Sequence, residues 1–264
     1  MWFHTDNAVL TVLQALCVAL PAAGLPAWLA RARRGAWALV LPLSIVVCIA
    51  AISLVPASAD VYTWAALLGV PIGAALALGW AAHGARPWLA LLAIPLLAVA
   101  WVLQDARVGQ LAGDLLIAGS AVTLGRLLAG SGPLGLVKAG LVAMAAIDAY
   151  LVFSGRLEAP NATLVAAVPA PGLPSLQAGA FGFSSLGYGD FLAAGVLGGI
   201  LAIERRPQWW MAGAMLVVSL AWDQLFRVFD VLPATVPPAL VLIGLEAHRA
   251  LRRRTALRPS ADPA

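Results

Sequence analysis

Charged side chains are scarce in this sequence. Only 11% of its 264 residues are Asp, Glu, Lys or Arg, whereas a soluble domain carries about 25%. Long polar segments are also missing, because the longest are a short N-terminal stub and a tail after about Leu251. The two absences exclude a soluble globular fold, and we expect no appended soluble domain.

Cysteine and histidine are also sparse, with two and three residues respectively. Cys17 and Cys48 both lie in apolar runs, so we expect two small buried core residues and no disulfide framework. His4, His83 and His248 are far apart and form no His-Glu-x-x-His motif. We therefore expect no metal site and no cofactor.

Apolar residues make up 62% of the chain, in repeated runs of about 20 residues. Such runs are long enough to cross a bilayer as helices. The sequence predicts an all-α polytopic membrane protein that forms a single transmembrane domain over residues 1–264. Residues 1–130 would hold helices one to five, and 131–254 would hold helices six to nine with a long loop at 154–179. The nine predicted spans are 8–30, 36–55, 61–82, 87–103, 111–129, 133–153, 180–203, 208–226 and 232–250.

The basic residues lie in short loops at the ends of these spans, so they form no nucleic-acid-binding face. If the N-terminus is outside, the inner loops and the tail hold thirteen of the sixteen basic residues. The positive-inside rule then predicts an outer N-terminus and a cytoplasmic C-terminus. The thirteen are Arg31, Arg33, Arg34, Arg86, Arg126, Lys138, Arg205, Arg206, Arg249, Arg252, Arg253, Arg254 and Arg258.

Two aspartates fall inside predicted spans. Asp148 lies about five residues before the end of span six, and Asp190 about ten residues after the start of span seven. Both are then expected ~8–15 Å below the same surface. An ionised carboxylate at that depth costs roughly 3 kcal/mol or more, so such residues are first interpreted as functional. Because the two helices are antiparallel neighbours, each aspartate is the expected partner of the other.

A pair of facing carboxylates that shares one proton is the core of aspartyl-protease chemistry. The ionised member removes a proton from water, and the protonated member donates to the peptide carbonyl oxygen. Around Asp190, Gly187 and Gly189 would remove side chains where an extended substrate backbone comes close. The residues Val236-Pro237-Pro238-Ala239-Leu240 would leave irregular backbone near the same depth, which membranes tolerate only beside protein or a cavity. The loop 154–179 joins the two aspartate helices and is a candidate gate or substrate-docking strand.

These motifs resemble, in order, those of the presenilin and signal peptide peptidase family of intramembrane aspartyl proteases. Asp148 matches the family's Tyr-Asp motif, Gly187-Tyr188-Gly189-Asp190 its Gly-x-Gly-Asp motif, and Pro238-Ala239-Leu240 its Pro-Ala-Leu motif. Ile147 stands where the family has tyrosine, and Tyr150 is a replacement only if it points into the site. The resemblance covers about Leu134 to Leu245.

The resemblance implies a presenilin-like fold with Asp148 and Asp190 as catalytic residues. It also implies that Gly187, Tyr188, Gly189, Pro238, Ala239 and Leu240 contact the substrate. Substrates would be transmembrane helical peptides in a lipid bilayer, with the N-terminus in the cytosol as for signal peptide peptidase. The compact chain, rich in Ala, Leu, Gly and Arg, suggests a prokaryotic cell membrane. No nucleic acid, metal or cofactor is implied.

Two alternatives stay open at the level of sequence. A type IV prepilin peptidase is another membrane aspartyl protease with a Gly-x-Gly-Asp motif, but it requires neither Pro-Ala-Leu nor nine spans. A proton-coupled transporter could use the two aspartates as a proton relay. Inverted repeats would favour the transporter, and none is visible in the sequence.

Overall fold

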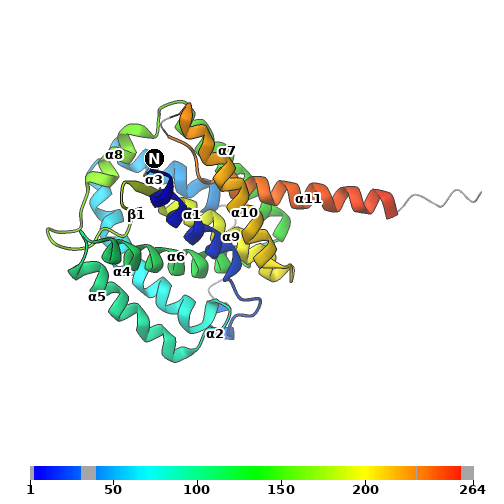
Figure 1. The fold of residues 1–264 in the computed structure, drawn as a ribbon, viewed down its shortest axis with the longest axis horizontal. Coiled ribbons are helices and arrows are strands. Elements are labelled where there is room, and N and C mark those ends of the chain that lie inside the picture. The colour runs from blue at the N-terminus through cyan, green and yellow to red at the C-terminus, as the bar shows by residue number, and fades with distance from the viewer. Residues whose placement is uncertain (1–2, 31–39, 230, 257–264) are drawn as a thin grey trace, which may run out of the picture.

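Most of the chain is helical. The computed structural model describes residues 3–30, 40–229 and 231–256, and within them one two-stranded antiparallel sheet accompanies the helices (Figure 1). The α-helices are α1 (Phe3–Ala19), α2 (Ala27–Ala30), α3 (Val40–Leu54), α4 (Ser58–Leu76), α5 (Ala93–Val102), α6 (Arg107–Ala129), α7 (Leu134–Phe153), α8 (Glu158–Ala166), α9 (Tyr188–Ile203), α10 (Gln208–Trp222) and α11 (Val236–Ala256). The remaining elements are a π-helical turn η2 (Ala77–Ala81), two 3₁₀ segments η3 (Pro87–Leu92) and η4 (Asp223–Arg227), and the strands β1 (Ala178–Phe181) and β2 (Ser184–Gly187).

Three helices in the described part of the chain are long and apolar enough to cross a membrane: Ser58–Ala81, Arg107–Ala129 and Leu134–Phe153. This supports a membrane association, but the count differs from the nine spans predicted. Shorter apolar helices occupy four of the other predicted ranges, at Asp6–Ala19, Leu43–Leu54, Pro87–Val102 and Tyr188–Ile203. Apolar composition therefore extends further along the sequence than continuous helix does.

Proline explains one of the shortened spans. The predicted span 8–30 ends as a helix at Ala19, and the chain returns to helix only at Ala27. Pro21 and Pro26 fall in that break, where the missing N–H groups and the rings do not allow an α-helix to continue. By contrast, Pro71 lies inside α4 without ending it. The sequence did not distinguish these two outcomes.

A hairpin replaces the start of predicted span seven. β1 pairs with β2 around a two-residue turn at Gly182 and Phe183, and Gly182 has a φ of +59°. The helix α9 begins only at Tyr188, directly after β2. The predicted loop 154–179 is also partly regular, because it contains α8 and the first residues of β1. Asp190 therefore lies in the first turn of its helix, and not ten residues inside it.

The core forms where α9 packs against α6 and α1. α9 is buried along its whole face from Phe191 to Ala202. A Cβ at Gly195 would overlap backbone atoms of Ala121 in α6, and a Cβ at Gly198 would overlap backbone carbonyls of α1. These glycines therefore permit the close packing of α9 against α6 and α1.

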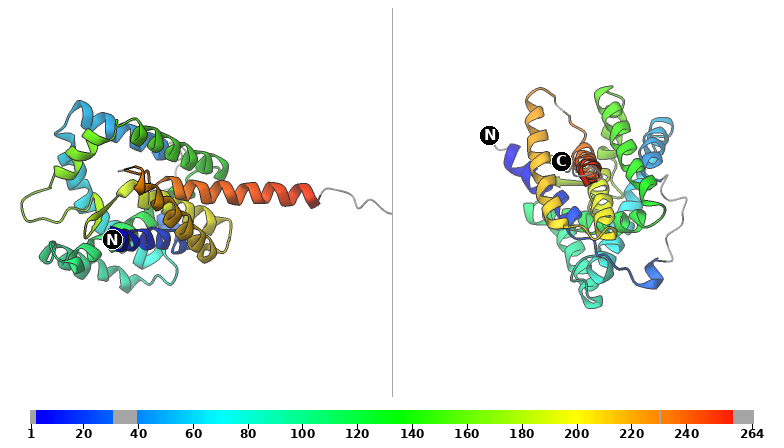
Figure 2. Two further views of the ribbon diagram at one scale, coloured as in Figure 1. Left: turned by 45° about the horizontal axis from the view of Figure 1, so that its top comes forward. Right: turned by 90° about the vertical axis from the view of Figure 1, so that its right-hand side faces the viewer.

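The helices α7, α9 and α11 pack against one another. α11 begins beside α7 and α9 and then leaves the body, so its last turns are exposed (Figure 1). The left view of Figure 2 shows the same projection, and the right view looks along α11. The body therefore contains the start of α11, together with the segment before it.

Candidate active site

Asp148 lies in the second half of α7, with its side chain only 6% exposed. Its Oδ2 accepts a hydrogen bond of 2.6 Å from the hydroxyl of Thr235, which is itself buried. Thr235 immediately precedes α11. One oxygen of the Asp148 carboxylate is therefore fixed by a residue 87 positions away in the sequence.

Asp190 is the third residue of α9 and serves the start of that helix. Its Oδ2 accepts a hydrogen bond of 3.1 Å from the backbone N–H of Gly187, as the acidic residue of a capping box does. The strand β2 ends at Gly187, so the hairpin and the helix cap together orient this carboxylate. The depth predicted for Asp190 was wrong because it was counted from a helix start at residue 180. The apolar and glycine-rich residues before Asp190 form strands, and α9 begins only at Tyr188.

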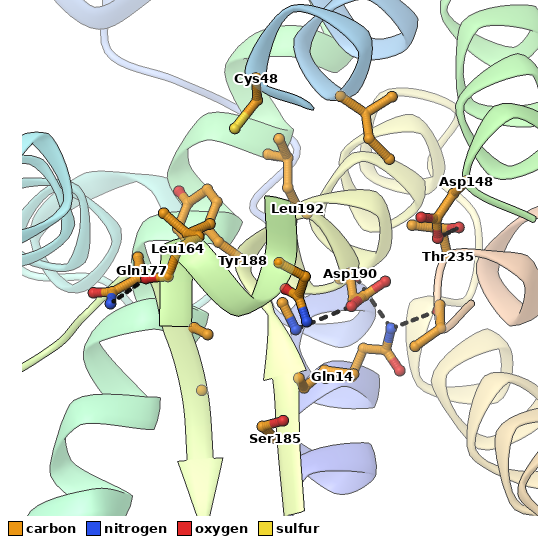
Figure 3. Close-up of a pocket in the computed structure, with 18 of the residues that line it drawn as sticks. Gln14, Cys48, Asp148, Leu164, Gln177, Ser185, Tyr188, Asp190, Leu192 and Thr235 are labelled. Atoms are coloured by element: carbon orange, nitrogen blue, oxygen red, sulfur yellow. Dashed lines mark hydrogen bonds between the residues drawn. The ribbon is translucent and has the colours of Figure 1, made fainter. Parts of the chain in front are cut away.

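The two carboxyl groups open into one cavity of about 910 Å³ (Figure 3). Within the described residues, the second oxygen of each carboxylate has no hydrogen-bond partner in the protein. The structure therefore brings together the two aspartates that the sequence paired, each with one oxygen held and one oxygen available.

A hydrogen-bond bridge connects the backbones around the two aspartates. Gln14 of α1 is 2% exposed, and its Nε2 donates both to the carbonyl of Asp190 (3.1 Å) and to the carbonyl of Ala234 (3.0 Å). Ala234 is the neighbour of Thr235, which binds Asp148 (Figure 3). Gln14 thus ties the start of α9 to the segment that holds the other carboxylate.

The cavity is mainly apolar, with a few polar groups near the aspartates. Its walls come from α1, α3, α4, α6, α7, α8, the hairpin, α9, α10, η4 and the segment before α11. The polar lining includes Gln14, Ser120, Thr123, Tyr188 and Thr235, of which Gln14 and Thr235 hydrogen-bond to Asp190 and Asp148 respectively. The apolar lining includes Ile45, Ile49, Ile52, Ile72, Leu76, Leu124, Leu127, Val152 and Leu164. Such a surface suits an apolar peptide segment more than a polar metabolite.

Three of the predicted substrate-contacting residues line this cavity: Gly187, Tyr188 and Gly189. The Tyr188 hydroxyl lies 2.8 Å from Oγ of the buried Ser120, which fixes the ring against α6. A Cβ at Gly187 would lie 3.2 Å from Oδ2 of Asp190. The glycine therefore makes room for the capping carboxylate, a role that the sequence interpretation did not include.

The predicted Pro238-Ala239-Leu240 contact is displaced by a few residues. None of the three lines the cavity, since Pro238 and Ala239 are buried elsewhere and Leu240 is 43% exposed. The lining comes from Val231 to Thr235 and from Pro237 instead. The reason is that α11 starts at Val236, so the irregular backbone lies before the prolines and not at them.

Sequence reasoning missed Gln14 and Thr235. A signal for Gln14 was present, because a polar side chain inside an apolar run of membrane-spanning length is itself a functional indication. Tyr150 does not replace the missing family tyrosine. Its side chain is 58% exposed, lies outside the cavity lining and stacks under the guanidinium of Arg156.

No group of three or more His, Cys, Asp or Glu side chains in the described ranges is placed to hold a metal ion. Comparisons with protein-family models, with curated proteins and with solved structures find no match for this chain.

Proposed function

We propose that this protein is an intramembrane aspartyl protease of the presenilin and signal peptide peptidase type. It would hydrolyse peptide bonds within transmembrane helices, with Asp148 and Asp190 as a general acid and base pair. The observation that carries the proposal is the shared cavity of about 910 Å³, into which both carboxylates open from neighbouring helices. The ordered motifs of the sequence add support, with Pro238-Ala239-Leu240 beside the site and not in it.

The chemistry requires one proton shared between two carboxyl groups. The ionised aspartate removes a proton from a water molecule, whose oxygen attacks the peptide carbonyl carbon. The protonated aspartate donates its proton to the carbonyl oxygen, which gives a neutral tetrahedral intermediate. When that intermediate collapses, the C–N bond breaks and the carboxyl group that took the water proton passes it to the leaving nitrogen. The other carboxylate takes back a proton from a hydroxyl of the intermediate, which becomes the new carboxylic acid and restores the starting pair. One oxygen of each carboxylate is held by a hydrogen bond, and the other oxygen is available for these proton transfers.

The site also supports an unwound peptide as substrate. A helical peptide bond is surrounded by its own side chains, so it must become extended before two carboxylates can reach it. β2 leads directly into Gly187 and the aspartate, and two of the residues there have no side chain. An extended segment can approach such a strand edge through its backbone groups.

The orientation is proposed from the charge pattern. With the N-terminus outside and the C-terminus in the cytoplasm of a prokaryotic cell, thirteen of sixteen basic residues are inside. In this arrangement the aspartates lie toward the outer half of the membrane. Substrates would then have their N-terminus in the cytosol, in the manner of signal peptide peptidase substrates.

The test is cleavage of a labelled transmembrane peptide by the purified protein in liposomes with no ion gradient. Products are identified by mass spectrometry, and Asp148→Asn and Asp190→Asn are run as controls whose thermal unfolding is checked. We expect internal cleavage by the wild type and loss in each variant. Proton flux that needs both aspartates, with every peptide left intact, would contradict the proposal and favour the proton-coupled transporter. Cleavage confined to a short leader at a membrane boundary would favour a prepilin-peptidase-like enzyme.

A further inference from the structure

A second hollow lies at the end of α9 opposite Asp190. Its volume is about 540 Å³, and it forms where the chain turns from α9 into α10. The residues that give it its chemistry are Ala23, His83, Arg205, Arg206, Gln208 and Trp209. Neither aspartate contributes to it, so the hollow is separate from the candidate active site.

Hydrogen bonds hold the walls of this hollow together. Gln208 is 7% exposed, and its Nε2 donates to the carbonyls of Pro21 (2.9 Å) and Val18 (3.2 Å). Its Oε1 lies 2.9 Å from Nε2 of His83. The backbone N–H of His83 in turn donates to Leu20. One buried side chain thus fixes two turns against the start of α10, and the hollow is preformed.

Positive charge gathers around the hollow. Arg205 and Arg206 line it, and Arg126 lies behind its wall, where it donates to the carbonyls of Ala22 (2.7 Å) and Ala23 (2.6 Å). The acid nearby is Glu204, 3.4 Å from Nε of Arg206. Its charge is shared with two further cations, because Lys138 (2.6 Å) and Arg249 (2.9 Å) bind the same carboxylate. The hollow therefore keeps an excess of positive charge.

Arg205 occupies a backbone position that favours glycine. Its φ is +53°, and it is the one non-glycine residue with positive φ in the described ranges. Helices commonly end on such a left-handed residue, which is usually glycine because a Cβ is disfavoured there. An arginine at this place is less stable than a glycine would be, and its side chain lines the hollow. Outliers of this kind cluster at functional sites.

Two exposed tryptophans lie at the start of α10, and the first of them lines the hollow. Trp209 and Trp210 at the start of α10 are 63% and 78% exposed. Exposed tryptophans next to basic residues are typical of the membrane–water interface. The hollow also borders the start of α10, because Gln208 and Trp209 line it, and the positive end of a helix dipole favours an anion.

We propose that this hollow binds the phosphate group of an anionic phospholipid. Arginine guanidinium groups bind phosphate oxygens in a bidentate manner, and basic hollows between membrane helices suit such head groups. Arg205 and Arg206 would hold the phosphate, while Trp209 contacts the glycerol region. The proposal is independent of the protease activity, since no residue of the aspartate cavity takes part.

The test measures lipid retained by the purified protein in a non-ionic detergent, by native mass spectrometry with added phosphatidylglycerol or phosphatidylcholine. We expect phosphatidylglycerol to be retained at least fivefold more, and Arg205→Gly to remove most of that preference. Arg205→Gly is expected to fold at least as well as the wild type, because glycine suits the positive φ. Arg253→Gln on the exposed end of α11 is the matched control and should change retention less than twofold.

Three results would overturn the proposal. The first is equal retention of both lipids by the wild type. The second is an unchanged preference in Arg205→Gly and in the double variant Arg205→Gly, Arg206→Gln. The third is displacement of phosphatidylglycerol by an equal concentration of inorganic phosphate, which would assign the hollow to a soluble anion and not to a lipid.

Discussion

Thr235 is the residue that most directly controls one carboxylate. Its hydroxyl donates to Oδ2 of Asp148 from a buried position. A hydrogen bond to a charged group contributes about 1.5–3 kcal/mol. Replacement by the isosteric Thr235→Val leaves that oxygen unheld, so we expect kcat to fall by about ten- to hundredfold. Thr235→Ser, which keeps the donor, should retain most of the activity. Equal kcat values in the valine variant and the wild type would show that the contact has no role in catalysis.

The two glycines beside Asp190 are expected to act differently. A Cβ at Gly187 would press on Oδ2 of Asp190 at 3.2 Å, although its φ of −64° is open to alanine. Gly187→Ala should therefore lower kcat by about tenfold through misplacement of the carboxylate. A Cβ at Gly189 would meet only the Met144 side chain, at an ordinary 3.5 Å. Gly189→Ala should raise KM if the substrate backbone passes there, with kcat little changed. The reverse assignment of kcat and KM effects would contradict this account.

The hairpin is the element that carries Asp190 into place. Three side chains from α1 and α6 accept hydrogen bonds from backbone N–H groups of the hairpin. Oδ1 of Asp114 accepts from Ala180 (2.9 Å), Oε1 of Gln110 from Gly182 (2.9 Å) and Oδ2 of Asp6 from Phe183 (3.3 Å). The hairpin is therefore attached to the core helices at successive points, and its position depends on them.

Removing one of these acceptors should loosen the hairpin. Asp114→Ala leaves the Ala180 N–H without its partner, so we expect faster hydrogen exchange in residues 178–187 and a several-fold loss of cleavage. Asp114→Asn keeps an acceptor oxygen and serves as the matched control. If the alanine variant leaves the exchange rates of β1 and β2 unchanged, the hairpin is held by other contacts.

The sequence predicted some elements well and others poorly for physical reasons. The pairing of Asp148 with Asp190 followed from two carboxylates in apolar surroundings. The hairpin was missed because Ala178–Gly187 is apolar and small, and its strand identity depends on acceptors from distant helices. The Gln14 bridge and the Thr235 contact join residues more than eighty positions apart, as in Asp148–Thr235, so no local pattern encodes them. The helix break at Pro21 was not predicted because a proline in the sequence does not by itself end a helix. Pro71, for example, lies inside α4.

At the scale of the whole molecule, an ion-pair cluster joins the start of α7, the end of α9 and the middle of α11, away from the aspartates. Lys138 bridges Glu204 and Glu246, and Arg249 contacts the same two carboxylates. Partial burial by itself raises the pKa of Glu204, but hydrogen bonds and charges from Lys138 and Arg249 outweigh it and leave the pKa below the usual glutamate value. The cluster therefore favours the folded arrangement of the three helices while Glu204 is ionised.

This linkage fixes the direction of a pH effect. Because the folded-state pKa of Glu204 is lowered, its stabilisation is complete above the unfolded value of about 4.3 and is lost as the pH falls below it. The unfolding temperature of the wild type should therefore drop between about pH 5 and about pH 3 by more than that of Glu204→Gln, which cannot titrate. Parallel unfolding profiles for the two proteins would contradict the assignment.

The central claim is that Asp148 and Asp190 act as one catalytic unit. The most direct test compares peptide-cleavage rates of the wild type, Asp148→Asn, Asp190→Asn and the double variant under one condition. Residues that act as a unit are strongly non-additive. We predict that each single variant falls to the same background as the double variant. A single variant that keeps substantial activity, or rates that decrease additively from single to double, would contradict the account.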